Sequence, residues 1–91
     1  SKIRQNQTAP IHFISFEPLL AQVEEDIPDF INWIIIGALT GPDSEKHRPD
    51  PAWIADLIQK ADRLGAAVFL KNNLRGICPG PWRQEWPKIK Q

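Results

Sequence analysis

The chain has 91 residues, 42% of which are hydrophobic, and its eleven acidic side chains balance eleven lysines and arginines. This length allows one small domain or a fragment of a larger one, spanning residues 1–91. The zero net charge argues against a mainly electrostatic nucleic-acid binder, because phosphate binding needs concentrated positive charge. No apolar run in the sequence is long enough to span a bilayer, which argues against a membrane protein.

Cysteine and methionine usage adds two expectations. The single Cys78 excludes an internal disulfide and fits a reducing, cytoplasmic setting. The chain has no methionine and begins at Ser1, so we expect it to have been processed or cut from a longer reading frame.

Two apolar runs in the first half predict β-strands. Residues 1–9 are polar and lack periodicity, which indicates a lead-in segment. Residues 11–16 then form a nearly continuous apolar run of the kind found in strands covered on both faces, and Pro18 discourages its continuation. Residues 31–36 are the most hydrophobic part of the chain, and their β-branched side chains again favour a buried parallel strand.

The middle of the chain predicts a loop and one helix. Residues 37–49 read as a long loop with turn residues at 41–44. Asp50 is suited to the N-cap and Pro51 to the first helical position, and Gly65 stands where a C-terminal cap is needed. The apolar stripe of this helix recurs at spacings of three and four and consists of Ile54, Leu57, Ile58, Ala61 and Leu64.

A third strand is predicted at residues 67–70, which completes a β-β-α-β body over residues 10–74. Residues 75–91 read as an irregular tail pinned to the body by Trp82 and Trp86. The predicted fold class is therefore α/β, with three parallel strands and one main helix. Because a parallel sheet needs cover on both faces, we expect a partner chain, a domain swap or missing upstream sequence to complete it. This requirement favours the C-terminal portion of a (β/α) barrel.

Polar residues follow each predicted strand, and parallel strands would bring them to one rim, where α/β folds place their sites. Glu17 follows the first strand and could accept a ligand amine, a hydroxyl or a proton. Lys71 follows the third and could hold a carboxylate or a phosphate. The alternative is structural: Glu17 pairs with Lys71, or Lys71 simply extends its charge to solvent. These two residues are the candidate catalytic groups.

Six further residues at the same rim are candidate ligand-binding positions. Glycines in the loop after the second strand would let a ligand approach the backbone, and the asparagines could bond a ligand or support a turn. Neither phosphate-loop pattern is present, and His12, His47 and Cys78 are too scattered to predict a metal site. The six candidates are Gly37, Gly41, Asp43, Arg48, Asn72 and Asn73.

Five blocks of the chain occur in an order that resembles a known family. They cover nearly all of residues 11–88, and they are FISFEPLL at 13–20, NWIIIG at 32–37 with GP at 41–42, RPDPAW at 48–53, VFLKNNL at 68–74 and WRQEWP at 82–87. The family resembled is the C-terminal portion of a phage and bacterial family of unknown function related to radical S-adenosylmethionine barrels, with spore photoproduct lyase as a distant relative.

The resemblance implies a partial or full (β/α) barrel, in which an upstream cysteine cluster would hold a four-iron four-sulfur cluster that binds and cleaves S-adenosylmethionine. This chain has no such cysteine cluster, so alone it could not perform that chemistry. Glu17, Lys71 and Asn72 match strand-end positions of the motifs and would line the barrel mouth. The implied partner is then the missing N-terminal part of the same polypeptide.

Three functional hypotheses follow. In the first, the chain supplies one wall of a ligand or cofactor pocket, with Glu17 and Lys71 as polar anchors and residues 37–43 as a lid or backbone cradle. In the second, it is a small non-catalytic binding or assembly module whose partner is another copy of itself, contacted through the uncovered sheet. The third and weakest is nucleic-acid contact by the basic tail, through Arg75, Arg83 and Lys88.

Overall fold

The fold is an open three-stranded parallel sheet with one main helix, which confirms the predicted α/β class. The computed structural model describes residues 10–87, so the predicted lead-in at 1–9 and the last residues of the tail, 88–91, lie outside the described part. In chain order the elements are β1 (Phe13–Phe16), β2 (Trp33–Ile36), the short 3-10 helix η2 (Ser44–His47), α1 (Pro51–Leu64), β3 (Ala67–Leu70) and the 3-10 helix η3 (Asn72–Leu74).

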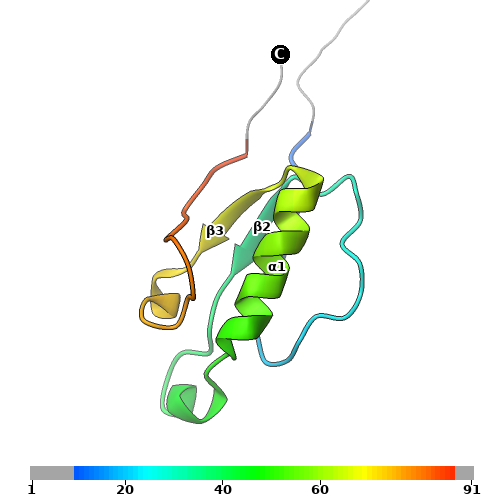
Figure 1. Cartoon of the computed structure of the whole chain (residues 1–91). Coiled ribbons are helices and arrows are strands. Elements are labelled where there is room, and N and C mark those ends of the chain that lie inside the picture. The colour runs from blue at the N-terminus through cyan, green and yellow to red at the C-terminus, as the bar shows by residue number, and fades with distance from the viewer. Residues whose placement is uncertain (1–9, 88–91) are drawn as a thin grey trace, which may run out of the picture.

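The sheet has the order β1-β2-β3, and both neighbouring pairs are parallel. In this register Phe13 lies beside Trp33, and Trp33 lies beside Ala67. The three strands therefore start and end level with one another. Their carboxyl ends point toward the end of the molecule that carries η2 and η3 (Figure 1).

One face of the sheet packs against α1 and forms the core. Side chains that alternate along β2 and β3 point to this face, and the helix contributes its apolar stripe. The fully buried residues of this layer are Ile34, Ile36, Val68 and Leu70 from the sheet and Ile54, Leu57 and Ala61 from the helix. Asp50 caps α1 by accepting a hydrogen bond from the Ala52 N–H at 2.8 Å, and Gly65 ends it at φ +72°, so both predicted helix boundaries are confirmed.

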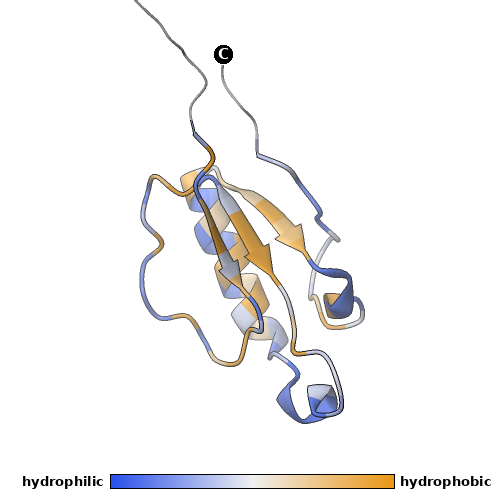
Figure 2. Ribbon diagram, turned by 180° about the vertical axis from the view of Figure 1, so that it is seen from behind, coloured by the Kyte–Doolittle hydropathy of each residue, from blue (hydrophilic) through white to orange (hydrophobic). Residues whose placement is uncertain are grey.

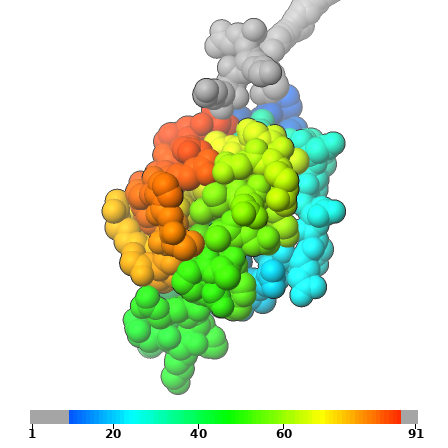
Figure 3. Space-filling model, in the orientation of Figure 1, coloured from blue at the N-terminus to red at the C-terminus, as the bar shows by residue number. Residues whose placement is uncertain are grey.

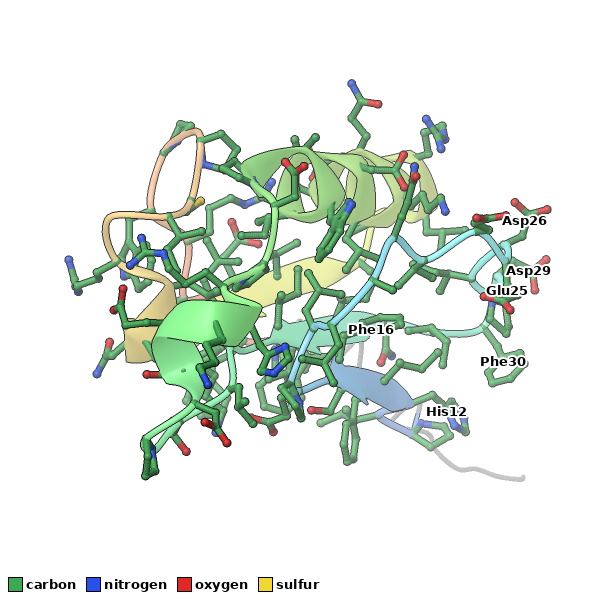
Figure 4. All side chains as sticks on the ribbon, turned by 90° about the horizontal axis from the view of Figure 1, so that it is seen from below. His12, Phe16, Glu25, Asp26, Asp29 and Phe30 are labelled. Atoms are coloured by element: carbon green, nitrogen blue, oxygen red, sulfur yellow. The ribbon has the colours of Figure 1, made fainter. Side chains whose placement is uncertain are left out.

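The crossover from β1 to β2, residues 17–32, covers the part of this face that α1 leaves free (Figure 1). It has no helix or strand of its own, but it buries Leu19, Ile27 and Ile31 in the core. Lys60 of α1 fixes it by donating to the Val23 carbonyl at 2.7 Å. The acidic side chains Glu25, Asp26 and Asp29 project outward from the far side of the crossover (Figure 4).

Among residues 10–87, no helix covers the opposite face of the sheet (Figure 2). Phe13 of β1 is 56% exposed on this open face, and Ser15 is exposed beside it. The expectation that the first strand is covered on both faces is therefore wrong for the part of the chain described here. The physical reason is that both covering segments, α1 and the crossover, lie on the same side of the sheet.

The tail contributes an antiparallel extension along the outer edge of β3. The Leu70 N–H donates to the Arg83 carbonyl, and the Glu85 N–H donates to the Val68 carbonyl, each at 2.8 Å. Beyond this edge Trp86 packs over Trp33 on the open face, with ring centroids 5.1 Å apart. The part of the predicted tail at residues 83–86 is thus held in an ordered, strand-like path.

The guanidinium group of Arg83 joins this tail to α1 through Asp62 and Glu85, and these three residues are called the clasp below. Arg83 binds both carboxylate oxygens of Asp62, at 3.1 and 3.0 Å, and its Nε donates to Glu85 at 2.8 Å. The hydrogen bonds to Glu85 and Asp62 raise the pKa of Arg83, and the same guanidinium lowers the pKa of Glu85. Within residues 10–87, no helix is long and apolar enough to cross a membrane.

Candidate functional site

Glu17, Gly37 and Lys71 form one row across the carboxyl ends of the three strands. Each directly follows the last residue of its strand, and those last residues are paired in register. The ladder continues through the row, because the Gly37 N–H donates to the Phe16 carbonyl and the Lys71 N–H to the Ile36 carbonyl. Since side chains alternate along a strand, the row belongs to the open face of the sheet. The predicted meeting of polar strand ends at one rim is confirmed.

The outer members of the row form an ion pair across the middle strand. Lys71 Nζ lies 3.4 Å from Glu17 Oε2, and the two side chains are 46% and 40% exposed. The other carboxylate oxygen, Oε1, accepts a hydrogen bond from the Ser15 hydroxyl at 2.9 Å. Ion pairs this exposed typically contribute only about 0–1 kcal/mol to stability. The pair therefore places two opposite charges at the rim without adding much to the stability of the fold.

Gly37 provides the space in which this pair meets. A Cβ at this position would lie 3.1 Å from Glu17 Oε2 and 3.2 Å from Lys71 Cγ. Its φ is not in the left-handed region, so the requirement for glycine comes from close approach rather than from backbone conformation. The sequence predicted that a ligand would approach Gly37, and in the structure two protein side chains do so.

A groove of about 490 Å³ runs along the row. Its walls are Glu17, Pro18, Ala38, Leu39, Thr40, Lys71 and Asn73. Asn73 fixes the wall formed by the loop after β2, because its amide donates to the Ala38 carbonyl at 2.9 Å and accepts from the Ala38 N–H at 3.0 Å. One wall of the groove is thus held by two hydrogen bonds of the Asn73 side chain.

A second hollow, of about 280 Å³, lies behind residues 38–40 and next to η2. Arg48 lines it and pairs with Glu45 at 3.6 Å, and Gly41 lines it with a φ of +95°. In the space-filling view, the segment around η2 projects beyond the rest of the molecule (Figure 3). The two predicted residues Gly41 and Arg48 therefore belong to a neighbouring hollow that shares a wall with the groove.

Two other predicted ligand-binding residues lie outside both hollows. Asp43 begins η2 and makes no side-chain cap hydrogen bond there. Asn72 is turned toward the tail, where its Oδ1 accepts from Gln84 Nε2 at 2.9 Å. The same Gln84 amide donates to the Leu70 carbonyl at 2.8 Å, so Asn72 joins the tail to the end of β3.

Two polar contributors to the site were not among the predicted site residues, although one of them, Thr40, lies within residues 37–43, predicted as a lid or backbone cradle. Ser15 lies two residues before Glu17 on the same strand face, and strand alternation could have identified it. Thr40 lines both hollows, but nothing in the sequence distinguishes it from other loop residues. Among the residues with described positions, no three His, Cys, Asp or Glu side chains gather as possible metal ligands.

Comparison with known proteins places these residues in a family. A family model described as a protein of unknown function, DUF5131, matches residues 1–79. The match includes the three strands, α1, the row at the rim and the lining of both hollows, and it ends before the tail segment at 83–86. No curated protein and no solved structure matches the chain significantly. Because the family model covers most of the sequence, the chain belongs to the DUF5131 family.

Proposed function

We propose that this chain forms one wall of a ligand pocket at the mouth of a partial (β/α) barrel, with Glu17 and Lys71 as its polar anchors. The observation that supports it is the row at the rim, in which an exposed ion pair with a 3.4 Å separation spans a glycine at the carboxyl ends of parallel strands. This end of a parallel sheet is where α/β proteins bind their ligands.

The barrel part of the proposal rests on the pattern of the open face. Strand alternation places three rows on it: Phe13, Trp33 and Ala67 first, then Ser15, Ile35 and Phe69, then the polar row at the rim. Layers of this kind fill the interior of (β/α) barrels, with the helices outside. The outer edge of β3 is occupied by residues 83–85, whereas β1 has no strand on its outer edge among the described residues. Further strands would therefore join at β1, and the barrel would be partial.

We further propose, from the sequence resemblance, that the polypeptide containing this wall is a radical S-adenosylmethionine type of enzyme. The residues of this chain do not fit the iron–sulfur cluster of such an enzyme, because it offers a single thiol, the half-buried Cys78. The cluster ligands would have to come from another part of the polypeptide. The role left to this chain is to bind and orient the ligand, and the cluster chemistry would take place on residues from elsewhere in the polypeptide.

The test is to substitute the two anchors in the intact polypeptide. Glu17→Ala and Lys71→Ala should each weaken S-adenosylmethionine binding by about tenfold, since each removes one of the two charged groups that anchor the pocket. The matched control is Glu24→Ala, which removes an exposed carboxylate of the crossover with no ion pair in the described region. Calorimetric titration measures the affinity, and unchanged unfolding temperatures show that the variants fold. Wild-type affinity in both anchor variants would contradict the proposal.

The coding sequence upstream of Ser1 provides an independent test of the enzyme class. An in-frame extension with closely spaced cysteines is expected if the polypeptide is a radical S-adenosylmethionine enzyme. A stop codon followed by a start codon close to Ser1 would contradict this class and favour a small self-associating module instead. The structural observation behind that second candidate is Phe13, which is 56% exposed on a strand whose outer edge is free in the described part. A second copy would then take the place of upstream strands.

A further inference from the structure

We infer that the groove beside Gly37 binds an oxyanion of its ligand, a carboxylate or a phosphate, through Lys71, and that Glu17 acts as the positioning residue for this lysine. The inference rests on the proposed pocket function and assigns different roles to its two anchors. In the described structure, some hydrogen-bonding groups of the groove are already paired within the protein, and others are free.

The carboxylate of Glu17 is already engaged at both oxygens. Oε1 accepts from the Ser15 hydroxyl at 2.9 Å, and Oε2 lies 3.4 Å from Lys71 Nζ. Both oxygens are therefore already bound by groups of the protein, so Glu17 is better placed to orient the lysine than to contact a ligand itself.

Lys71 keeps unused hydrogen-bond donors after its contact with Glu17. An ammonium group has three N–H donors, and Glu17 is the only carboxylate within ion-pair distance among the residues whose positions are described. The side chain is 46% exposed and lines the groove. Its backbone is fixed by the ladder bond to the Ile36 carbonyl at 2.9 Å. The free donors of Lys71 can therefore reach a ligand from a defined position.

Three other residues that line the groove also carry hydrogen-bond donors. The Asn73 amide group has two N–H donors and uses one on the Ala38 carbonyl. The backbone N–H groups of Leu39 and Thr40 have no hydrogen-bond partner in the described structure, and both residues line the groove. The Thr40 hydroxyl adds a further donor. A cation and several neutral donors lining one groove form an arrangement suited to binding an oxyanion.

No other cationic side chain lines this groove in the described structure. Arg48 lines the neighbouring hollow instead and pairs with Glu45. Removing the charge of Lys71 should therefore remove anion binding in the groove, rather than shift it to a neighbouring cation. Lys46 of η2 gives a matched control, because it is exposed and lines neither hollow.

The test titrates the ¹⁵N-labelled intact protein with inorganic phosphate and, separately, with acetate, at constant pH and ionic strength. We expect saturable shifts of the Gly37, Leu39 and Thr40 amide signals. Lys71→Gln should weaken this binding by about tenfold or more, Lys71→Arg should retain it, and Lys46→Gln should leave it unchanged. Tighter binding of phosphate than of acetate would identify a phosphate-bearing ligand, and the reverse order a carboxylate.

The positioning role of Glu17 is tested by measuring the phosphate affinity of Glu17→Gln. This substitution keeps the shape of the side chain and the bond from Ser15, but it removes a charge that both holds the ammonium group and repels an oxyanion. Phosphate affinity should therefore change less than in Lys71→Gln. Shifts that do not saturate, or that persist in Lys71→Gln, would overturn the inference. If Lys71→Ala weakens S-adenosylmethionine binding while phosphate and acetate do not bind, the pocket function stands and the oxyanion assignment fails.

Discussion

Glycine 37 is the residue on which the geometry of the rim depends. Any Cβ there would lie 3.1 Å from both Glu17 Cβ and Glu17 Oε2, which is closer than most real side-chain contacts. One of the neighbouring atoms, Glu17 Oε2, is a member of the ion pair, and another is Cγ of the Lys71 side chain, so relief of the clash would come from moving Glu17 or Lys71. A single methyl group is thus expected to change the site more than the fold.

We predict that Gly37→Ala separates the ion pair and weakens ligand binding by about tenfold, with a stability cost of about 1 kcal/mol from overpacking. The matched control is Gly80→Ala, since a Cβ at Gly80 meets no atom within 4 Å and its φ is not left-handed. Calorimetric titration and urea unfolding measure the two effects. Equal behaviour of the two alanine variants would show that the close approach at Gly37 is unimportant.

The Glu85 side chain should make the free energy of unfolding depend on pH in the acid range. Its pKa lies below its ordinary value of 4.5 in the folded state, chiefly because Arg83 donates to it. A depressed folded-state pKa contributes stability that is present above 4.5 and is lost as the pH falls through the lower folded value. Because the side chain is 42% exposed, solvent screening limits the effect to about 1 kcal/mol or less.

The measurement is urea unfolding between neutral pH and the acid range. The slope of stability against pH below 4.5 should be shallower in Glu85→Gln than in the wild type, since the glutamine cannot titrate. Glu24→Gln, which changes an exposed carboxylate without an ion pair in the described residues, should keep the wild-type slope. An identical pH dependence in all three proteins would show that the clasp contributes nothing to the acid response.

At the scale of single elements, the helices α1 and η2 can be compared, because each is preceded by an aspartate. Asp50 precedes α1 and accepts from the Ala52 N–H at 2.8 Å, whereas Asp43 precedes η2 and makes no cap hydrogen bond. We predict that Asp50→Ala lowers the free energy of unfolding by about 1 kcal/mol. Asp43→Ala should change it little. Urea titrations of both variants measure the difference, and equal losses would contradict the capping role.

The same comparison shows what the sequence could predict. The boundaries of α1 were correct because an aspartate cap, a proline at the first position and a final glycine act locally. The first two strands start two residues later than predicted, at Phe13 and Trp33. At β1 the cause is a side chain, since the His12 N–H donates to Asn32 Oδ1. Nothing local to residues 11–16 indicates that contact.

The row at the rim was predictable, and the clasp of the tail was not. Parallel strands bring their ends together whatever the loops do, so Glu17 and Lys71 were expected to meet. The contact of Arg83 with Asp62 joins residues 21 positions apart, and nothing in the sequence near either residue indicates it. Likewise, the sequence does not indicate that α1 and the crossover lie on the same side of the sheet, which is what leaves the rim residues on an open face.

At the scale of the whole molecule, the dominant feature is a sheet with one covered and one open face (Figure 2). On the β3 side Trp86 lies over the open face and packs against Phe69 at a centroid distance of 5.6 Å. On the β1 side Phe13 is exposed, and the strand has no neighbour on its outer edge in the described region. An exposed apolar edge strand is a site for pairing with another strand. In the described structure, the part of the open face that lacks a covering segment is therefore the part formed by β1.

We predict that the 91-residue chain self-associates through this edge when its concentration is raised. Phe13→Lys should weaken the association by about tenfold or more, because lysine on an edge strand opposes pairing and removes the apolar contact. Leu20→Lys is the control, since Leu20 is similarly exposed, at 54%, but lies on the crossover. Sedimentation velocity over a wide concentration range measures the association. A wild-type chain that stays monomeric throughout, or equal effects of the two lysines, would show that the β1 edge does not recruit a second copy and would leave upstream strands as its expected neighbour.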